Sequence, residues 1–213
     1  MSCGIPRPGP SEPFTLVPVT RAEVPVWFHV YCTKNHPTTA ETFSKGWGDT
    51  RFAPISTERG TPAHTYYAAS TPEGAFMESV LHEIPLSPPG QFDVSELRFY
   101  HLAQVQLPDS LDCVSFHTPY LPALGLTRAQ LIDSLPACYG ETRPWAEAAY
   151  RQRPGAKGIA YGSRRDDAAR CLMLFGQRLP DPSLAVLESE PLAVSPRREE
   201  VLTLVRRLKI REI

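Results

Sequence analysis

The chain has 213 residues, which is enough for one large domain or two small ones. Its apolar fraction of 42% and charged fraction of 21% are those of an ordinary globular protein. The formal net charge of -1 excludes a general electrostatic attraction to nucleic acid or to anionic membranes. No stretch approaches the roughly 18 apolar residues of a membrane span, and no signal peptide is visible at the N-terminus.

The five cysteines are an odd number and lie scattered along the chain. This usage favours free thiols in a reducing, cytoplasmic environment. Cys32 with His36, and Cys113 with His117, share a spacing, and four such side chains could bind zinc. The two pairs lie far apart and lack the tighter CxxC-type spacing of most zinc sites. We therefore expect no metal.

The chain begins with a proline-rich segment. Residues 1–13 carry four prolines among polar residues, which excludes a helix or a central strand, so we expect a flexible tail. No break divides residues 14–213, which predicts a single domain. Residues 24–32 are rich in β-branched and aromatic types and favour a strand. Residues 33–65 predict a long, partly irregular excursion, and loops of this length tend to be functional.

A short strand at 66–69 leads into a helix whose N-cap is either Ser70 or Thr71. Pro72 is well tolerated at the first helical position. Apolar residues then recur at three- and four-residue spacing as far as Ile84, which predicts a helix with one apolar face.

The second half of the chain mixes strands and helices without regular alternation. Residues 97–107 alternate in polarity and predict a half-buried strand. The other expected elements are short helices at 128–135 and 143–152, strands at 158–163, 169–175 and 183–194, and a last helix at 198–210. This order favours an α+β fold, with a mixed sheet core and peripheral helices, over a doubly wound sheet.

Several common motifs are absent from the sequence, namely GxGxxG, a Walker loop, HExxH and GxSxG. What remains is a set of separated polar residues. Arg51 lies in the loop sequence Asp-Thr-Arg-Phe-Ala-Pro, and Tyr67 precedes Glu78 by eleven residues. Ser163 ends the sequence Gly-Ile-Ala-Tyr-Gly-Ser, shortly before the apolar run Cys-Leu-Met-Leu-Phe at 171–175.

In this order and spacing the pieces resemble the RES domain, a family named for an arginine, a glutamate and a serine. Its pattern is approximately an Arg-Phe loop, Tyr-x-Ala with a glutamate eleven residues after the tyrosine, Gly-Ile-x-Tyr-x-Ser, and an apolar Cys-Leu-x-Leu-Phe strand. The resemblance covers about residues 27–178, including 142–150. It implies a fold similar to the core of ADP-ribosyltransferase toxins, consumption of NAD, and the role of toxin in a toxin–antitoxin pair.

The residue types suit cleavage of the nicotinamide–ribose bond of NAD. An arginine fork binds a pyrophosphate, which suggests Arg51. Cleavage builds positive charge on the ribose, and Glu78 is the candidate carboxylate that stabilises it. Tyr67 could stack on nicotinamide or bond the ribose, and Ser163 could hold Glu78 or a ribose hydroxyl. The alternatives are a solvated arginine and glutamate, a half-buried strand tyrosine and a turn serine.

Two departures from the family pattern concern the site. His29 stands where the family often has an arginine; it either replaces a phosphate contact or is a satisfied strand histidine. Asp49 and Thr50 replace expected glycines.

The functions left open are NAD hydrolysis or phosphorolysis, transfer of ADP-ribose to a protein or small molecule, and an inactive partner-binding module. The resemblance implies a helix-turn-helix antitoxin; we expect no direct contact with nucleic acid or membrane, and a homodimer is left open.

Overall fold

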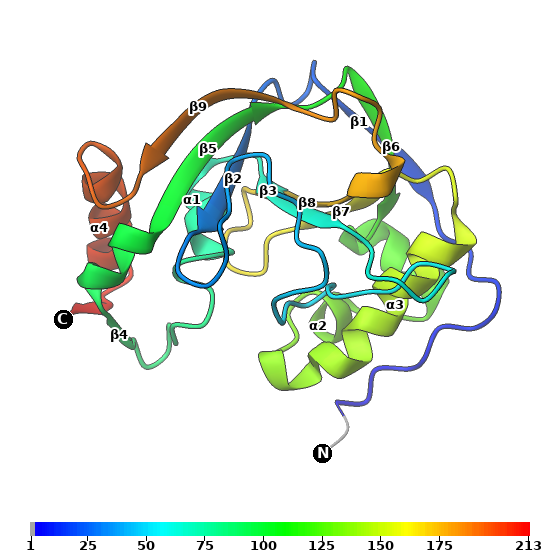
Figure 1. Cartoon of the computed structure of the whole chain (residues 1–213). Helices are drawn as coiled ribbons and strands as arrows, with labels where there is room; N and C mark the ends of the chain where they lie inside the picture. The colour runs from blue at the N-terminus through cyan, green and yellow to red at the C-terminus, as the bar shows by residue number, and fades with distance from the viewer. Residues whose placement is uncertain (1–2) are drawn as a thin grey trace.

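The computed structural model describes residues 3–213 and centres on one curled, eight-stranded sheet (Figure 1). The strand order is β1-β6-β7-β8-β3-β2-β5-β9, and only β6 and β7 pair in parallel. The strands are β1 Leu16–Thr20, β2 Trp27–Cys32, β3 Thr65–Ala69, β5 Tyr100–Gln106, β6 Ser110–Ser115, β7 Gly158–Gly162, β8 Arg170–Phe175 and β9 Ala185–Pro191. A separate parallel pair is formed by β4 Gln91–Phe92 and β10 Arg211–Glu212.

Helices lie around the sheet, with α2 and α3 together on one side and α4 at the opposite end, beside β9 (Figure 1). The α-helices are α1 Pro72–Met77, α2 Arg128–Leu131, α3 Tyr139–Gln152 and α4 Arg197–Arg207. The 3₁₀ helices in the described part of the chain are η1 Val94–Phe99, η2 Thr118–Leu124, η3 Pro136–Cys138 and η4 Gly176–Arg178. The predicted α+β class, with a mixed sheet and peripheral helices, is confirmed. Within residues 3–213, no helix is long and apolar enough to span a membrane.

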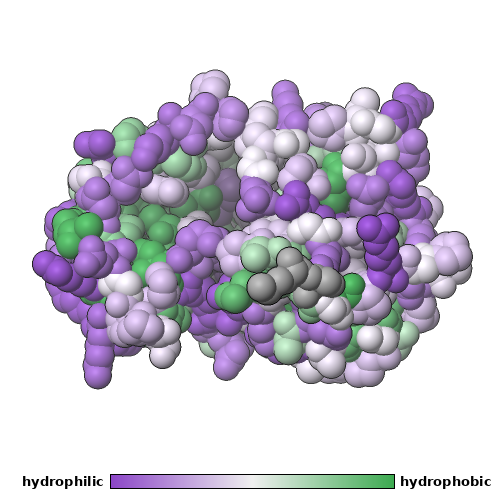
Figure 2. Space-filling view, turned by 90° about the horizontal axis from the view of Figure 1, so that it is seen from below, coloured by the Kyte–Doolittle hydropathy of each residue, from purple (hydrophilic) through white to green (hydrophobic). Residues whose placement is uncertain are grey.

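Two apolar clusters pack on opposite faces of the sheet, because successive strand residues point to opposite sides. In β8, Met173 and Phe175 belong to the cluster that also contains Phe76 of α1 and Trp145 of α3, whereas Leu172 belongs to the other cluster. The first cluster therefore fills the helix-covered face. Viewed from below, polar residues cover much of the molecule, and apolar residues gather in a recess (Figure 2).

The helix after β3 is shorter than its apolar spacing predicts. Thr71 is the N-cap, and its Oγ1 accepts from the Gly74 N–H at 3.0 Å. The helix ends at Met77, and turns replace the expected helix as far as Ile84. The guanidinium of Arg165 donates to three carbonyls in this stretch, among them that of Leu81 at 2.7 Å. A side chain from a distant loop thus binds carbonyls that a longer helix would use.

Four strands, β1, β4, β6 and β10, were not predicted from the sequence, and of these β1 and β6 belong to the eight-stranded sheet. They pair with each other in antiparallel register, and β1 forms one edge of the sheet. Pro18 lies inside β1, and a proline is accepted in a strand mainly at a sheet edge, where its missing N–H is not needed. Because of this proline, residue propensities did not predict β1.

The proline-rich segment, which the sequence predicts to be a flexible tail, makes hydrogen bonds to α3 within residues 3–13. The carboxylate of Glu141 accepts from the N–H groups of Cys3 and Ile5, at 2.8 and 3.1 Å. The Trp145 indole donates to the Pro6 carbonyl at 2.7 Å. The segment has no helix or strand, as its prolines predict. Residues 1–2 of the predicted tail lie outside the described residues.

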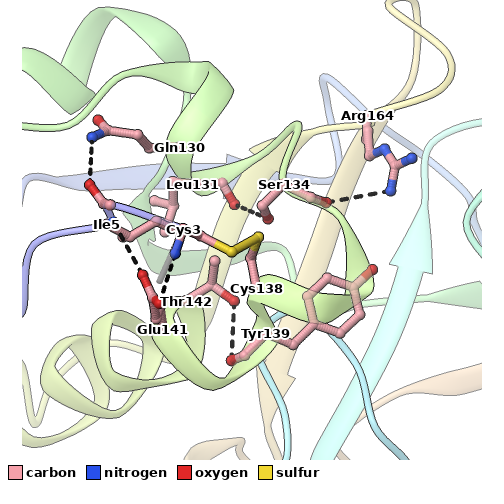
Figure 3. The surroundings of a disulfide bond; sticks show 11 residues. Cys3, Ile5, Gln130, Leu131, Ser134, Cys138, Tyr139, Glu141, Thr142 and Arg164 are labelled. Atoms are coloured by element: carbon pink, nitrogen blue, oxygen red, sulfur yellow. Dashed lines mark hydrogen bonds between the residues drawn. A yellow bond between two sulfur atoms is a disulfide. The ribbon is translucent and has the colours of Figure 1, made fainter. Parts of the chain in front are cut away.

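A disulfide joins Cys3 to Cys138, just before α3 (Figure 3). The prediction that all cysteines are free thiols is therefore wrong for these two. The hydrogen bonds to Glu141 bring Cys3 to α3, a proximity that a separation of 135 residues gave no reason to expect. Cys32, Cys113 and Cys171 are free. Among residues 3–213, no three His, Cys, Asp or Glu side chains gather as a metal site.

Removing this disulfide should lower thermal stability. A link across 135 residues restricts the unfolded chain strongly, but the hydrogen bonds to Glu141 and Trp145 remain without it. We expect a loss of about 1–2 kcal/mol, near the lower end for native disulfides, which is a fall in Tm of roughly 2–8 °C. The measurement is calorimetry with and without reductant. Reductant should act equally on the wild type and on Cys32→Ser, and not on the Cys3→Ser, Cys138→Ser double variant; a wild type insensitive to reductant would contradict the bond.

Candidate active site

Three of the predicted site residues come together on the helix-covered face of the sheet. The Ser163 hydroxyl donates to Oε1 of Glu78 at 2.6 Å. Nη1 of Arg51 lies 3.7 Å from the other carboxylate oxygen, Oε2. The three residues come from the loop before β3, the end of α1 and the loop after β7, so the fold joins positions that are far apart in sequence.

Glu78 is fixed from two sides. It is the C-cap residue of α1, and its backbone N–H donates to the Gly74 carbonyl. Its Oε1 accepts a second hydrogen bond from the Arg164 N–H at 2.8 Å. The side chain is only 12% exposed, and Oε2 makes no comparable hydrogen bond to the described residues. One carboxylate oxygen is thus anchored, and the other is left to face Arg51.

Ser163 is fully buried and holds Glu78, one of the two roles considered for it. While its hydroxyl donates to Glu78, its oxygen accepts from the N–H groups of Arg165 and Asp166, at 3.0 and 3.1 Å. Its carbonyl accepts from Arg128 at 2.7 Å. With these bonds in place, the serine acts on the carboxylate and offers little to a ligand.

Arg51 is 3% exposed, although arginine is rarely buried without partners. Its guanidinium lies over the rings of Phe52 and Tyr139, with 5.9 and 5.8 Å from Cζ to the two centroids. The Thr142 hydroxyl donates to its carbonyl at 2.5 Å and ties the loop to α3. Nε and Nη2 are buried and have no hydrogen-bond partner among residues 3–213. These two donors form one edge of the guanidinium, the edge that binds an oxyanion with two parallel bonds.

Tyr67 borders this cluster without bonding to it. Its hydroxyl shares a hydrogen bond of 2.7 Å with Oγ1 of Thr50, the residue before Arg51. Burial raises the pKa of Tyr67 well above its usual value, so the phenol stays protonated. Thr50 also bonds the backbone of Ala53 at 3.1 Å, so Tyr67 supports the turn that carries Arg51.

His29 is the predicted site residue that the fold places elsewhere. Its side chain points to the other face of the sheet, where it stacks on Tyr66 with 4.0 Å between ring centroids. Its Nδ1 lies 2.7 Å from the Tyr67 carbonyl, and burial lowers its pKa to about 4. A carbonyl can only accept, so Nδ1 carries the proton and Nε2 is an acceptor at neutral pH. A phosphate oxygen also accepts, so this imidazole does not suit the phosphate contact considered for it.

Two further residues near the cluster were missed by the sequence analysis. The Tyr139 hydroxyl lies 3.3 Å from Nε2 of His82, and Nδ1 of His82 lies 2.6 Å from the carboxylate of Glu83. Burial lowers the pKa of His82 and raises that of Tyr139. His82 could have been noticed four residues after Glu78, on the expected helix face. Tyr139 carried no such signal, because it precedes the predicted helix at 143–152.

The fold and the cluster define a class of protein: an α+β protein with a curled mixed sheet that holds an arginine, a glutamate and a serine together on one face. A family model of the RES domain matches residues 26–196, and the chain belongs to this family. Among solved structures, a chain of the M. tuberculosis MbcT–MbcA toxin–antitoxin complex is similar in fold, at 15% identity and a TM-score of 0.57, over 81% of this chain and 88% of that one. No curated protein sequence matches significantly.

Proposed function

We propose that the protein is an enzyme that cleaves the nicotinamide–ribose bond of NAD, by hydrolysis or phosphorolysis, and that it is the toxin of a toxin–antitoxin pair. The observation that carries the proposal is the unpartnered, buried edge of Arg51 beside the anchored carboxylate of Glu78. The Arg51 donors suit an anionic group of the substrate, and the fixed carboxylate of Glu78 suits a neighbouring group that becomes positively charged during the reaction.

Arg51 supplies the anion-binding half of this arrangement. Its two unpartnered donors are desolvated, and buried donors are normally hydrogen-bonded. A pyrophosphate that approaches this edge satisfies both donors with parallel, charge-assisted bonds. The aromatic rings of Phe52 and Tyr139 beside the guanidinium limit its freedom to turn away.

Glu78 supplies the other half. Departure of nicotinamide leaves positive charge on the ribose, as in cleavage of other glycosidic bonds. The carboxylate is held by Ser163 and by the Arg164 N–H before the reaction begins, so it needs no reorganisation when that charge develops. Water or phosphate then attacks the ribose carbon from which nicotinamide has left.

The biological part of the proposal rests on the family and on the structural likeness. RES proteins are commonly toxins, and the similar solved structure is that of a toxin–antitoxin complex. We propose a helix-turn-helix antitoxin as the partner and the cytoplasm as the place of action. Sequencing of the genes beside this one tests for the partner.

The direct test is incubation of the purified chain with NAD and measurement of released nicotinamide, with and without phosphate. Release that needs phosphate assigns phosphorolysis, and release without it assigns hydrolysis. NAD labelled on the adenine side shows whether ADP-ribose becomes attached to added protein, which would favour transfer instead. A chain that releases no nicotinamide and binds no NAD would overturn the enzyme proposal and leave a partner-binding module.

A further inference from the structure

A pocket of about 390 Å³ lies where β2 and β3 separate. The two strands are in register at a single position, Phe28 opposite Ala69, and diverge beyond it. The pocket is lined from both faces of the sheet, by His29 on one and Tyr67 on the other, and by Trp47 of the long loop before β3. Its lining residues therefore include one from the face of the sheet on which Glu78 lies and one from the opposite face.

The pocket is lined by aromatic rings and by one hydrogen-bond acceptor that has no partner among the described residues. Trp47 is stacked on His36, with 4.6 Å between ring centroids, and both line the pocket. His29 is 9% exposed, its Nδ1 is engaged by the Tyr67 carbonyl, and its Nε2 has no hydrogen-bond partner in residues 3–213. With its pKa near 4, Nε2 remains an acceptor at neutral pH. The pocket thus suits a flat ring that carries an N–H donor.

The position of the pocket relative to Arg51 and Glu78 indicates which ring of the substrate it would bind. Thr50 lines the pocket, bonds the Tyr67 hydroxyl there, and is the residue next to Arg51. Arg51 is thus connected to both: its Nη1 lies 3.7 Å from Glu78, and its sequence neighbour Thr50 lines the pocket. If the nicotinamide ribose lies at Glu78 and the pyrophosphate at Arg51, the group beyond the pyrophosphate is adenosine.

We propose that the pocket between β2 and β3 binds the adenine of NAD, and that Nε2 of His29 accepts a hydrogen bond from the adenine 6-amino group. This inference rests on the proposed function, because it takes NAD as the substrate. It makes His29 a residue that selects the base, in place of the phosphate contact that the sequence suggested. A base with a carbonyl at position 6 puts an acceptor opposite Nε2 and loses the bond, and sites built around such a bond reject the analogue.

The test compares NAD with nicotinamide hypoxanthine dinucleotide, in which a carbonyl replaces the 6-amino group. The wild type should show a kcat/KM roughly tenfold or more lower for the analogue, mainly through KM, because the base contact is the same in the ground state and the transition state. His29→Phe should lower kcat/KM for NAD to the level of the analogue, so that the ratio approaches one. Equal use of both dinucleotides by the wild type would overturn the inference while leaving NAD cleavage in place. This comparison uses the wild type alone, so it does not depend on whether a variant folds.

His101→Phe is the matched control. His101 also lies on the sheet, stacks on Tyr31 at 4.9 Å and has a buried ring nitrogen without a partner among the described residues, but it does not line the pocket. Its substitution should leave the ratio of the two substrates unchanged. A change in the ratio as large as that in His29→Phe would overturn the assignment to His29.

Binding measurements test this inference independently of catalysis. Calorimetry should show that the wild type binds ADP-ribose more tightly than its inosine counterpart. His29→Phe should bind the two ligands with equal affinity. This result would support the pocket even if no nicotinamide were released. Nicotinic acid adenine dinucleotide should be bound as well as NAD; discrimination against it, with none against the hypoxanthine analogue, would place nicotinamide in the pocket and overturn the proposal.

Discussion

Glu78→Gln should reduce kcat for nicotinamide release by about 10²–10³-fold and change KM little. The reason is that only the transition state carries the ribosyl charge, so loss of the carboxylate charge affects turnover rather than binding. The size is that found when one preorganised electrostatic group is removed from comparable sites. Glutamine keeps an oxygen that accepts from Ser163 and from the Arg164 N–H, so the side chain should stay in place. The measurements are initial rates at varied NAD concentration.

Glu73→Gln is the control for this prediction. Glu73 is the same residue type on the same helix, but it is 53% exposed and pairs with Arg207. Its substitution should leave kcat unchanged. Unchanged turnover in Glu78→Gln would preserve the enzyme and remove Glu78 from its mechanism, and a shared loss in both variants would indicate damage to α1.

The convergence of Arg51, Glu78 and Ser163 could be predicted because their order and spacing match the motifs of a family, and each motif sits next to a strand. Tyr67-x-Ala lies in β3 and the serine motif in β7, and both strands flank β8. Neighbouring strands bring their ends together, so residues at those ends meet. Local patterns also found the alternating and apolar strands, since period-two polarity and β-branched content act over a few residues.

The parts that could not be predicted depend on long-range contacts. The face to which His29 points follows from the register of β2 against β5, where His29 lies opposite Ala103, and sequence reasoning had no access to that register. The anchoring of residues 3–13 depends on Glu141 and Cys138, more than 130 positions away. The early end of α1 depends on Arg165, which binds carbonyls across the loop. Each is a tertiary contact that overrides a local preference.

Arg51→Ala should weaken NAD binding as well as catalysis. The pyrophosphate is charged in the ground state and in the transition state alike, so the lost contact appears in Kd and KM. A charge-assisted hydrogen bond contributes roughly 1.5–3 kcal/mol, which corresponds to a Kd for NAD about 10- to 150-fold higher. Calorimetry of NAD binding to the wild type and the variant measures this change.

Arg51→Lys separates charge from geometry. Lysine keeps the positive charge near Glu78 but cannot offer the paired Nε and Nη2 donors that stand unpartnered within residues 3–213. If the two-donor edge holds the pyrophosphate, Arg51→Lys should bind NAD nearly as weakly as Arg51→Ala. Arg151→Ala, which removes an exposed arginine paired with Glu147 on α3, should bind NAD like the wild type. Full recovery in Arg51→Lys would show that a point charge suffices, and a Kd unchanged in Arg51→Ala would place the pyrophosphate elsewhere. Because Arg51 connects Glu78 with the pocket of His29 through its neighbour Thr50, that last result would also remove the reason for assigning adenine to the pocket.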